Sequence, residues 1–138
     1  MSSTAATTTA TTSASSGGAA GGSTTSPCPQ AFAGCTTFED HTADTEVTID
    51  FGGDGGLAYS PKCIQVRAST TSIKFAGDFT THPLTEACAP PQSVTFSVSD
   101  FQGSVGITFD VAGTYGYYCA VHGSPNGTGM AGAFEVVP

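Results

Sequence analysis

The chain has 138 residues with eleven acidic and three basic side chains, which gives a formal net charge of −8. So few Lys and Arg residues argue against nucleic-acid binding, which needs clustered basic side chains, and against charge-driven binding to an anionic membrane. The charge favours neutral or basic partners. No run of about 18 apolar residues is present, so we predict no transmembrane helix.

Residues 2–26 consist only of Ser, Thr, Ala and Gly. Such a segment cannot bury enough apolar surface to offset the entropy lost on ordering. We therefore expect residues 1–26 to be a disordered, flexible tether and residues 27–138 to be one domain with one core. The tether resembles the linker that follows the lipid-anchored cysteine of bacterial surface lipoproteins, and this resemblance implies a lipid anchor before it, although that cysteine is absent from this sequence.

Apolar and polar side chains alternate with a period of two along most of the domain. The alternating runs lie at residues 47–51, 64–67, 73–75, 94–98, 105–109, 115–119 and 134–136. Each run is short and bounded by Gly, Pro, Asp or Ser, which is typical of strands and turns. No stretch of ten residues has the apolar spacing of an amphipathic helix. The pattern predicts an all-β domain, built as an antiparallel sandwich of two sheets.

The five cysteines are Cys28, Cys35, Cys63, Cys88 and Cys119. They form no Cys-x-x-Cys pair, which excludes a zinc ribbon and a thioredoxin-type motif. The first four allow three disulfide pairings, among which proximity in sequence favours Cys28–Cys35 and Cys63–Cys88. Two disulfides indicate an oxidising compartment, so we expect an exported protein, periplasmic, on the cell surface or extracellular. Cys119 is then an unpaired thiol, and binding to a metal would explain it.

Cys119-x2-His122-x7-Met130 lies between the last two predicted strands. Thiolate and thioether sulfur favour Cu(I), imidazole serves both Cu(I) and Cu(II), and two His, one Cys and a weak axial Met form a blue-copper site. The second histidine must come from elsewhere, from His41 or His82. His82 follows a predicted strand and has apolar neighbours, whereas His41 lies in an acidic segment. We predict His82, Cys119, His122 and Met130 as the metal ligands.

Residues 113–137 resemble the C-terminal copper loop of plastocyanins and related cupredoxins. The family pattern is Tyr-Cys-x-x-His, a Gly-rich loop and Met-x-Gly-x-x-x-Val, matched here by Tyr118-Cys119, His122, Met130, Gly132 and Val136. The resemblance extends over about residues 46–138. It implies a cupredoxin-type two-sheet Greek-key β-sandwich that holds one type 1 copper ion per chain.

The resemblance also implies a function. A cupredoxin of this kind is a monomeric single-electron carrier that cycles between Cu(II) and Cu(I). Its expected partners are redox proteins, of the cytochrome or copper oxidase type, that dock near His122. The alternative is a copper-binding or delivery module for an exported copper enzyme. We do not expect an enzyme, because three histidines are too few for the further copper sites of multicopper oxidases and copper nitrite reductases.

The sequence departs from the family pattern at two places. Seven residues separate His122 from Met130, where plastocyanins have four. Pro83 follows the predicted ligand His82, where family members commonly have Asn, whose backbone N–H donates to the cysteine sulfur. Since proline has no N–H, we expect that hydrogen bond to the Cys119 sulfur to be missing.

Overall fold

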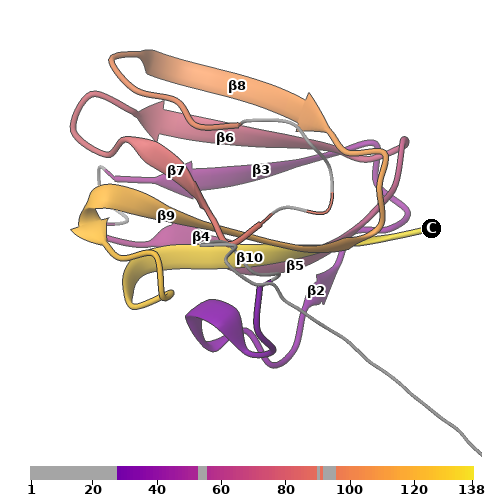
Figure 1. Ribbon diagram of the computed structural model, residues 1–138. Helices are drawn as coiled ribbons and strands as arrows, with labels where there is room; N and C mark the ends of the chain where they lie inside the picture. Colours follow the sequence, from indigo (N-terminus) through magenta and orange to yellow (C-terminus); the bar gives the residue numbers. More distant parts are fainter. Residues whose placement is uncertain (1–27, 53–55, 90, 92–95) are drawn as a thin grey trace, which may run out of the picture.

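The computed structural model describes residues 28–52, 56–89, 91 and 96–138. It is a sandwich of two β-sheets, drawn in Figure 1. The predicted tether, residues 1–26, lies outside the described residues, and so do residues 94 and 95 of one predicted strand. None of the helical segments in the described part of the chain is long and apolar enough to cross a membrane.

The first sheet has five strands and carries the C-terminal part of the chain. In spatial order its strands are β2 (Glu39–Asp40), β5 (Cys63–Arg67), β10 (Gly129–Val137), β9 (Gly113–Gly123) and β7 (Leu84–Ala87). A short 3-10 turn, η2 (Phe32–Gly34), packs against β10.

The second sheet has four strands and forms the opposite layer. In spatial order its strands are β4 (Tyr59–Ser60), β3 (Glu46–Phe51), β6 (Ser72–Asp78) and β8 (Gln102–Thr108). Both sheets are mixed, because β3 pairs with β6 in parallel, as β5 does with β10 and with β2. The predicted two-sheet β-sandwich is thus confirmed, whereas the expectation that its strands pair antiparallel was wrong for these three pairs. Alternation in sequence shows which face of a strand is buried, but it does not show which strand lies beside it.

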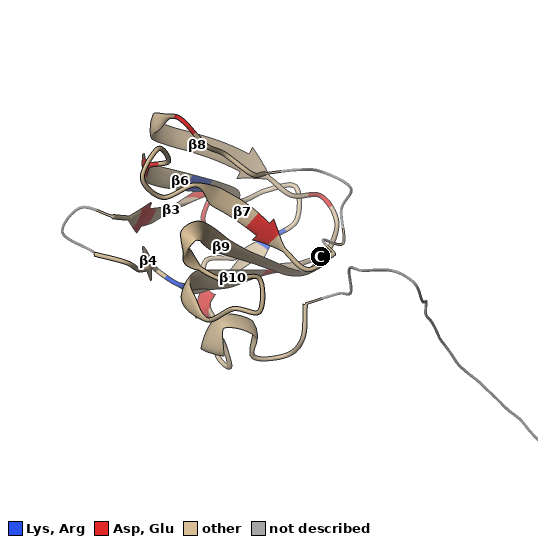
Figure 2. Ribbon diagram, turned by 60° about the vertical axis from the view of Figure 1, so that its left-hand side comes forward, with Lys and Arg blue, Asp and Glu red and all other residues tan. Residues whose placement is uncertain are grey.

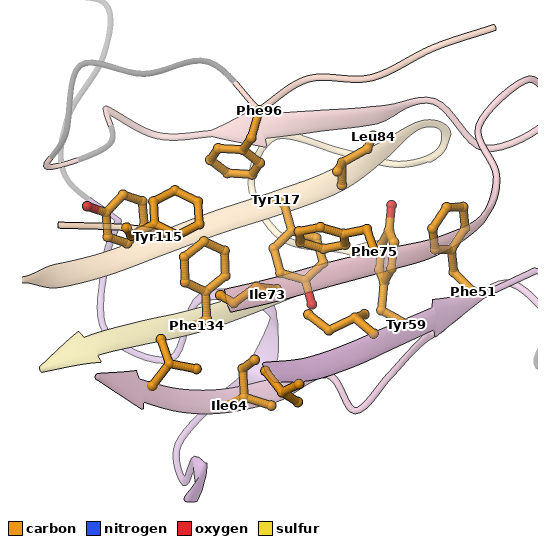
Figure 3. Close-up of a cluster of buried hydrophobic side chains, with 14 of the residues drawn as sticks. Phe51, Tyr59, Ile64, Ile73, Phe75, Leu84, Phe96, Tyr115, Tyr117 and Phe134 are labelled. Carbon is orange, nitrogen blue, oxygen red and sulfur yellow. The ribbon is translucent and has the colours of Figure 1, made fainter. Parts of the chain in front are cut away.

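The apolar side chains of the two sheets meet in one core. In β3 the residues Val47, Ile49 and Phe51 are buried, and the polar residues between them are exposed or half-buried. Aromatic rings fill much of the interlayer space, with the Tyr115 and Phe134 rings stacked at 5.0 Å between centroids. Figure 3 shows these rings lying between the layers. Such contacts add favourable ring–ring interactions to the burial of apolar area.

The structure differs from prediction around residues 84–98. Of the predicted strand at residues 94–98, the described residues 96–98 contain only an isolated bridge between Val98 and Leu84. A strand that was not predicted, β7, runs from Leu84 to Ala87 beside β9. Its two middle residues are polar and half-buried, so it lacks the alternation by which a strand is recognised.

The disulfides join Cys28 to Cys88 and Cys35 to Cys63. The pairing expected from proximity in sequence was therefore wrong. Cys63 begins β5 and Cys88 follows the edge strand β7, so the two bonds attach the segment that contains η2 to two separate strands of the five-stranded sheet. Loop closure costs only a little more entropy for a longer loop, so proximity in sequence is a weak guide to pairing. Cys119 is free, as expected, and it is buried.

The acidic side chains are distributed over the surface. In the view of Figure 2, Asp and Glu positions lie on β3, on β7 and in loops, and Lys and Arg positions are few. Lys74 forms an ion pair with Glu46 at 3.2 Å. This pair is partly exposed, so its contribution to stability is small.

Candidate metal centre

Three side chains converge at one end of the sandwich. The potential ligand atoms of His82, Cys119 and His122 all lie within 4.8 Å of one another. The two Nδ1 atoms are 3.2 Å apart, and the Cys119 Sγ atom lies 3.9 Å from His82 Nδ1 and 3.7 Å from His122 Nδ1. His82 comes from the turn before β7, and the other two come from β9. The structure thus brings together three of the four predicted ligands, one from the turn before β7 and two from β9.

An irregularity in strand pairing places Cys119 and His122 next to each other. Gly129 pairs with Gly123, whereas Ala131 pairs with Tyr118. Between these pairs, β9 contributes the four residues 119–122 and β10 contributes only Met130. Such a bulge bends its strand and redirects side chains. The sequence predicted that His122 lies in a loop, but β9 continues through Gly123 and the loop proper is residues 124–128.

Met130 is the single residue of β10 opposite this bulge. Its side chain is 1% exposed, and it belongs to the same buried cluster as Cys119, which is fully buried. His82 is 7% exposed, and His122 is half-buried. The candidate ligands are therefore buried except for His122, which is partly accessible from solvent.

The environment of His82 includes a residue that sequence analysis missed. A Cβ atom at Gly52 would lie 3.1 Å from Cδ2 and 3.2 Å from Nε2 of the His82 ring, and Gly52 has a φ of +73°. The ring of Phe51 meets His82 edge-on, with 6.3 Å between centroids. Sequence analysis did not find Gly52, because nothing in the local sequence shows that the turn at this residue packs against His82.

The spacing of the donor atoms fits a small metal ion. A small divalent ion such as Zn²⁺ lies about 2.0 Å from an imidazole nitrogen and about 2.3 Å from a thiolate. In a trigonal plane these lengths require about 3.5 Å between the nitrogens and about 3.7 Å between nitrogen and sulfur. The observed separations of 3.2, 3.7 and 3.9 Å are close to these values. Two imidazoles and a thiolate, with a thioether available, suit copper in both oxidation states.

Backbone N–H groups near Cys119 are used for strand pairing. The N–H of Ala120 donates to the Pro83 carbonyl at 2.9 Å, and the N–H of Leu84 donates to the Val98 carbonyl at 2.9 Å. Pro83 itself has no N–H to give. These three neighbours therefore direct no backbone hydrogen bond to the sulfur.

The longer loop between His122 and Met130 is held by its own hydrogen bonds. The Ser124 N–H donates to the Thr128 carbonyl at 3.0 Å, and the Asn126 side-chain oxygen accepts from the Thr128 N–H at 3.1 Å. A Cβ atom at Gly127 would lie 2.7 Å from the Ala33 backbone nitrogen, so the loop is packed closely on η2. The disulfide-bonded N-terminal segment thus supports the loop between two candidate ligands.

His41 lies in a different environment. Its Nδ1 atom is 2.8 Å from the Asp44 carboxylate, and its Nε2 atom is 2.7 Å from the Glu39 carboxylate. Burial lowers the pKa of His41, but its hydrogen bonds to both carboxylates outweigh this effect and raise the pKa above its usual value. Both ring nitrogens are engaged, and His41 does not belong to the cluster around Cys119.

Comparison with known proteins rests on structure, because the sequence matches no protein-family model and no curated protein. A copper-containing nitrite reductase from Thermus scotoductus is 22% identical with a TM-score of 0.51, over 67% of this chain and 22% of its own. A pseudoazurin from Sinorhizobium meliloti is 24% identical with a TM-score of 0.50, over 67% of this chain and 74% of the pseudoazurin. An amicyanin variant in its oxidised state is 19% identical with a TM-score of 0.51, over 70% of this chain and 87% of the amicyanin.

The chain thus spans less than a quarter of the nitrite reductase but most of the pseudoazurin and the amicyanin. At these identities the likeness concerns the fold. Pseudoazurin and amicyanin are cupredoxins, and the nitrite reductase shares the architecture over the matched part. The chain folds as a cupredoxin.

Proposed function

We propose that this protein is a single-electron carrier that holds one copper ion on His82, Cys119, His122 and Met130. The convergence of one thiolate and two imidazole donors within 4.8 Å, opposite Met130, is the observation that carries this proposal. The names of the structurally similar proteins add support, because they include a copper-containing nitrite reductase, a pseudoazurin and an amicyanin.

The chain supplies a rigid frame for electron transfer. Bound copper would supply the redox chemistry by alternating between the +2 and +1 states. Cys119 and His122 are held by the β9–β10 pair, and His82 is held by the Phe51 ring and by its N–H, which donates to the Asp78 carbonyl at 3.0 Å. Ligands held in this way move little between oxidation states, so little reorganisation opposes the transfer.

The half-buried His122 offers a route between the site and a partner. Val121, the residue before it, is 62% exposed. A redox partner protein docking here would approach the imidazole, whereas Cys119 and Met130 would stay out of its reach. The deep burial of these two ligands favours a carrier over a delivery module, which must release its ion to an acceptor. The two disulfides favour an exported location, where they persist.

Addition of Cu(II) to the metal-free protein tests the proposal directly. We expect an intense visible band from thiolate-to-copper charge transfer, which disappears on reduction and returns on reoxidation over repeated cycles. The Cys119→Ala variant should show no such band. A colourless wild-type protein, or a band that persists in Cys119→Ala, would contradict the proposed site. Loss of copper to a weak chelator before one redox cycle is complete would favour delivery instead.

The two histidine candidates are separated by a matched pair of variants. His82→Ala should abolish or strongly shift the visible band, because it removes a donor 3.2 Å from His122 Nδ1. His41→Ala should leave the band unchanged, because both ring nitrogens of His41 already face carboxylates. Absorption and electron paramagnetic resonance spectra of the copper-loaded variants would measure this. An altered site in His41→Ala with an intact one in His82→Ala would reverse the assignment.

A further inference from the structure

Within the described residues, the Tyr59 hydroxyl is the one buried side-chain polar atom without a hydrogen-bond partner. Tyr59 is 3% exposed. The two other buried tyrosines have partners, since Tyr115 donates to the Val111 carbonyl at 2.7 Å and Tyr117 donates to the Lys62 carbonyl at 3.4 Å. An unpaired buried hydroxyl costs free energy, so its presence calls for an explanation in function.

Tyr59 lies between Phe51, which contacts a candidate ligand, and Tyr117, which precedes another on β9. Its ring meets the Tyr117 ring edge-on at 4.8 Å, and it lies 5.3 Å from the Phe51 ring. Tyr117 is two residues before Cys119 on β9, so both side chains face the interior on the same side of the strand. Phe51 in turn contacts the His82 ring. Tyr59 is therefore flanked by a neighbour of the thiolate ligand and a neighbour of an imidazole ligand.

The Tyr59 side chain is directed toward the residue of β7 that pairs with Cys119. Figure 3 shows the Tyr59 ring extending from the four-stranded sheet toward Leu84. Leu84 is the residue of β7 that pairs with Cys119. Burial raises the pKa of Tyr59 far above its usual value, and a charge on Cys119 raises it further. The hydroxyl thus stays protonated and is available as a donor.

The sulfur of Cys119 is the acceptor that fits this donor. A thiol is a weak acceptor, but a metal-bound thiolate is electron-rich and attracts hydrogen-bond donors. Pro83 lacks an N–H, and the N–H groups of Leu84 and Ala120 donate to carbonyls. None of these three residues therefore donates a backbone N–H to the sulfur. The Tyr59 hydroxyl, in contrast, is a donor that has no partner.

We propose that Tyr59 is a positioning residue whose hydroxyl donates a hydrogen bond to the Cys119 sulfur when the site holds copper. This inference rests on the proposed copper-carrier function. The sulfur carries more negative charge in the Cu(I) state than in the Cu(II) state, where it gives electron density to the metal. A donor from Tyr59 stabilises the reduced state more and raises the reduction potential.

The Tyr59→Phe variant tests the proposal, because it removes the hydroxyl and keeps the ring. Copper-loaded Tyr59→Phe should have a lower reduction potential than the wild type, with a roughly tenfold shift of the redox equilibrium, or about 59 mV for one electron. Its thiolate-to-copper band should also shift. The matched control is Tyr117→Phe, which removes a hydroxyl that donates to Lys62 and should leave the potential within a few millivolts of the wild-type value.

The metal-free protein gives a readout that does not depend on copper. Tyr59→Phe should be as stable as the wild type or more stable in urea unfolding, because it removes an unpaired buried hydroxyl. Tyr117→Phe should be less stable, because it breaks a hydrogen bond. A loss of stability in Tyr59→Phe equal to that in Tyr117→Phe would show that the hydroxyl is already paired, and this would overturn the proposal.

The wild-type protein itself supplies a measurement for the case in which Tyr59→Phe fails to fold. After copper-loaded protein is refolded in D2O, the copper–sulfur vibrations in the resonance Raman spectrum should shift, because the proton on the donor has been exchanged. Unchanged vibrations, or an unchanged potential in Tyr59→Phe, would overturn the role of Tyr59 while the copper site stands. A colourless wild-type protein would instead overturn the proposed function.

Discussion

Replacing Cys28 and Cys88 together by alanine is expected to lower the free energy of unfolding by about 4 kcal/mol. The disulfide closes a loop across 60 residues, and its removal restores the conformational entropy of that loop to the unfolded chain. Replacing Cys35 and Cys63 opens a loop across 28 residues and should cost slightly less, about 3.5 kcal/mol. Urea unfolding of the oxidised proteins measures both losses. Equal stability of either variant and the wild type would contradict the expectation.

Thiol titration of the unfolded variants tests the connectivity itself. The Cys28→Ala/Cys88→Ala variant should expose one reactive thiol, that of Cys119, because Cys35 and Cys63 stay joined. The Cys28→Ala/Cys35→Ala variant should expose three thiols, because each of its substitutions leaves a partner unpaired. Three thiols in the first variant and one in the second would instead support the pairing of Cys28 with Cys35 and of Cys63 with Cys88.

Replacing Pro83 by asparagine is expected to raise the reduction potential of the copper site. The new backbone N–H becomes available to the Cys119 sulfur, and a donor there stabilises the electron-rich Cu(I) state more than the Cu(II) state. A hydrogen bond that stabilises the Cu(I) state by about 1.4 kcal/mol more than the Cu(II) state raises the reduction potential by about 59 mV for one electron. Cyclic voltammetry of the copper-loaded protein measures the shift.

Pro83→Ala is the matched control for this substitution. It supplies the same backbone N–H without an amide side chain, so it should raise the potential by a similar amount. The Pro83 carbonyl accepts the Ala120 N–H, and this contact is available in both variants. An unchanged or lower potential in both would show that a backbone N–H at this position does not reach the sulfur.

Much of the candidate site could be predicted from local sequence. The alternation in residues 47–51 and 73–75 corresponds to strands β3 and β6, because alternate side chains on a strand face opposite sides of the sheet. The spacing of Cys119 and His122 predicted donors that the structure brings together. His82 was preferred over His41 for its apolar neighbours, and it is the histidine found beside Cys119. These features depend on residues a few positions apart, so the sequence alone carries them.

Other features depend on residues that are distant in sequence. The disulfide pairing, the parallel strand pairs and the four-to-one bulge that faces Met130 arise from how the sheets assemble. Gly52 packs against His82, and Tyr59 packs against Tyr117, only because the two sheets face each other across the core. The sequence by itself determined most of the strands and the donor types. The tertiary structure alone decided which side chains surround the donors, because packing brings together residues that no local pattern relates.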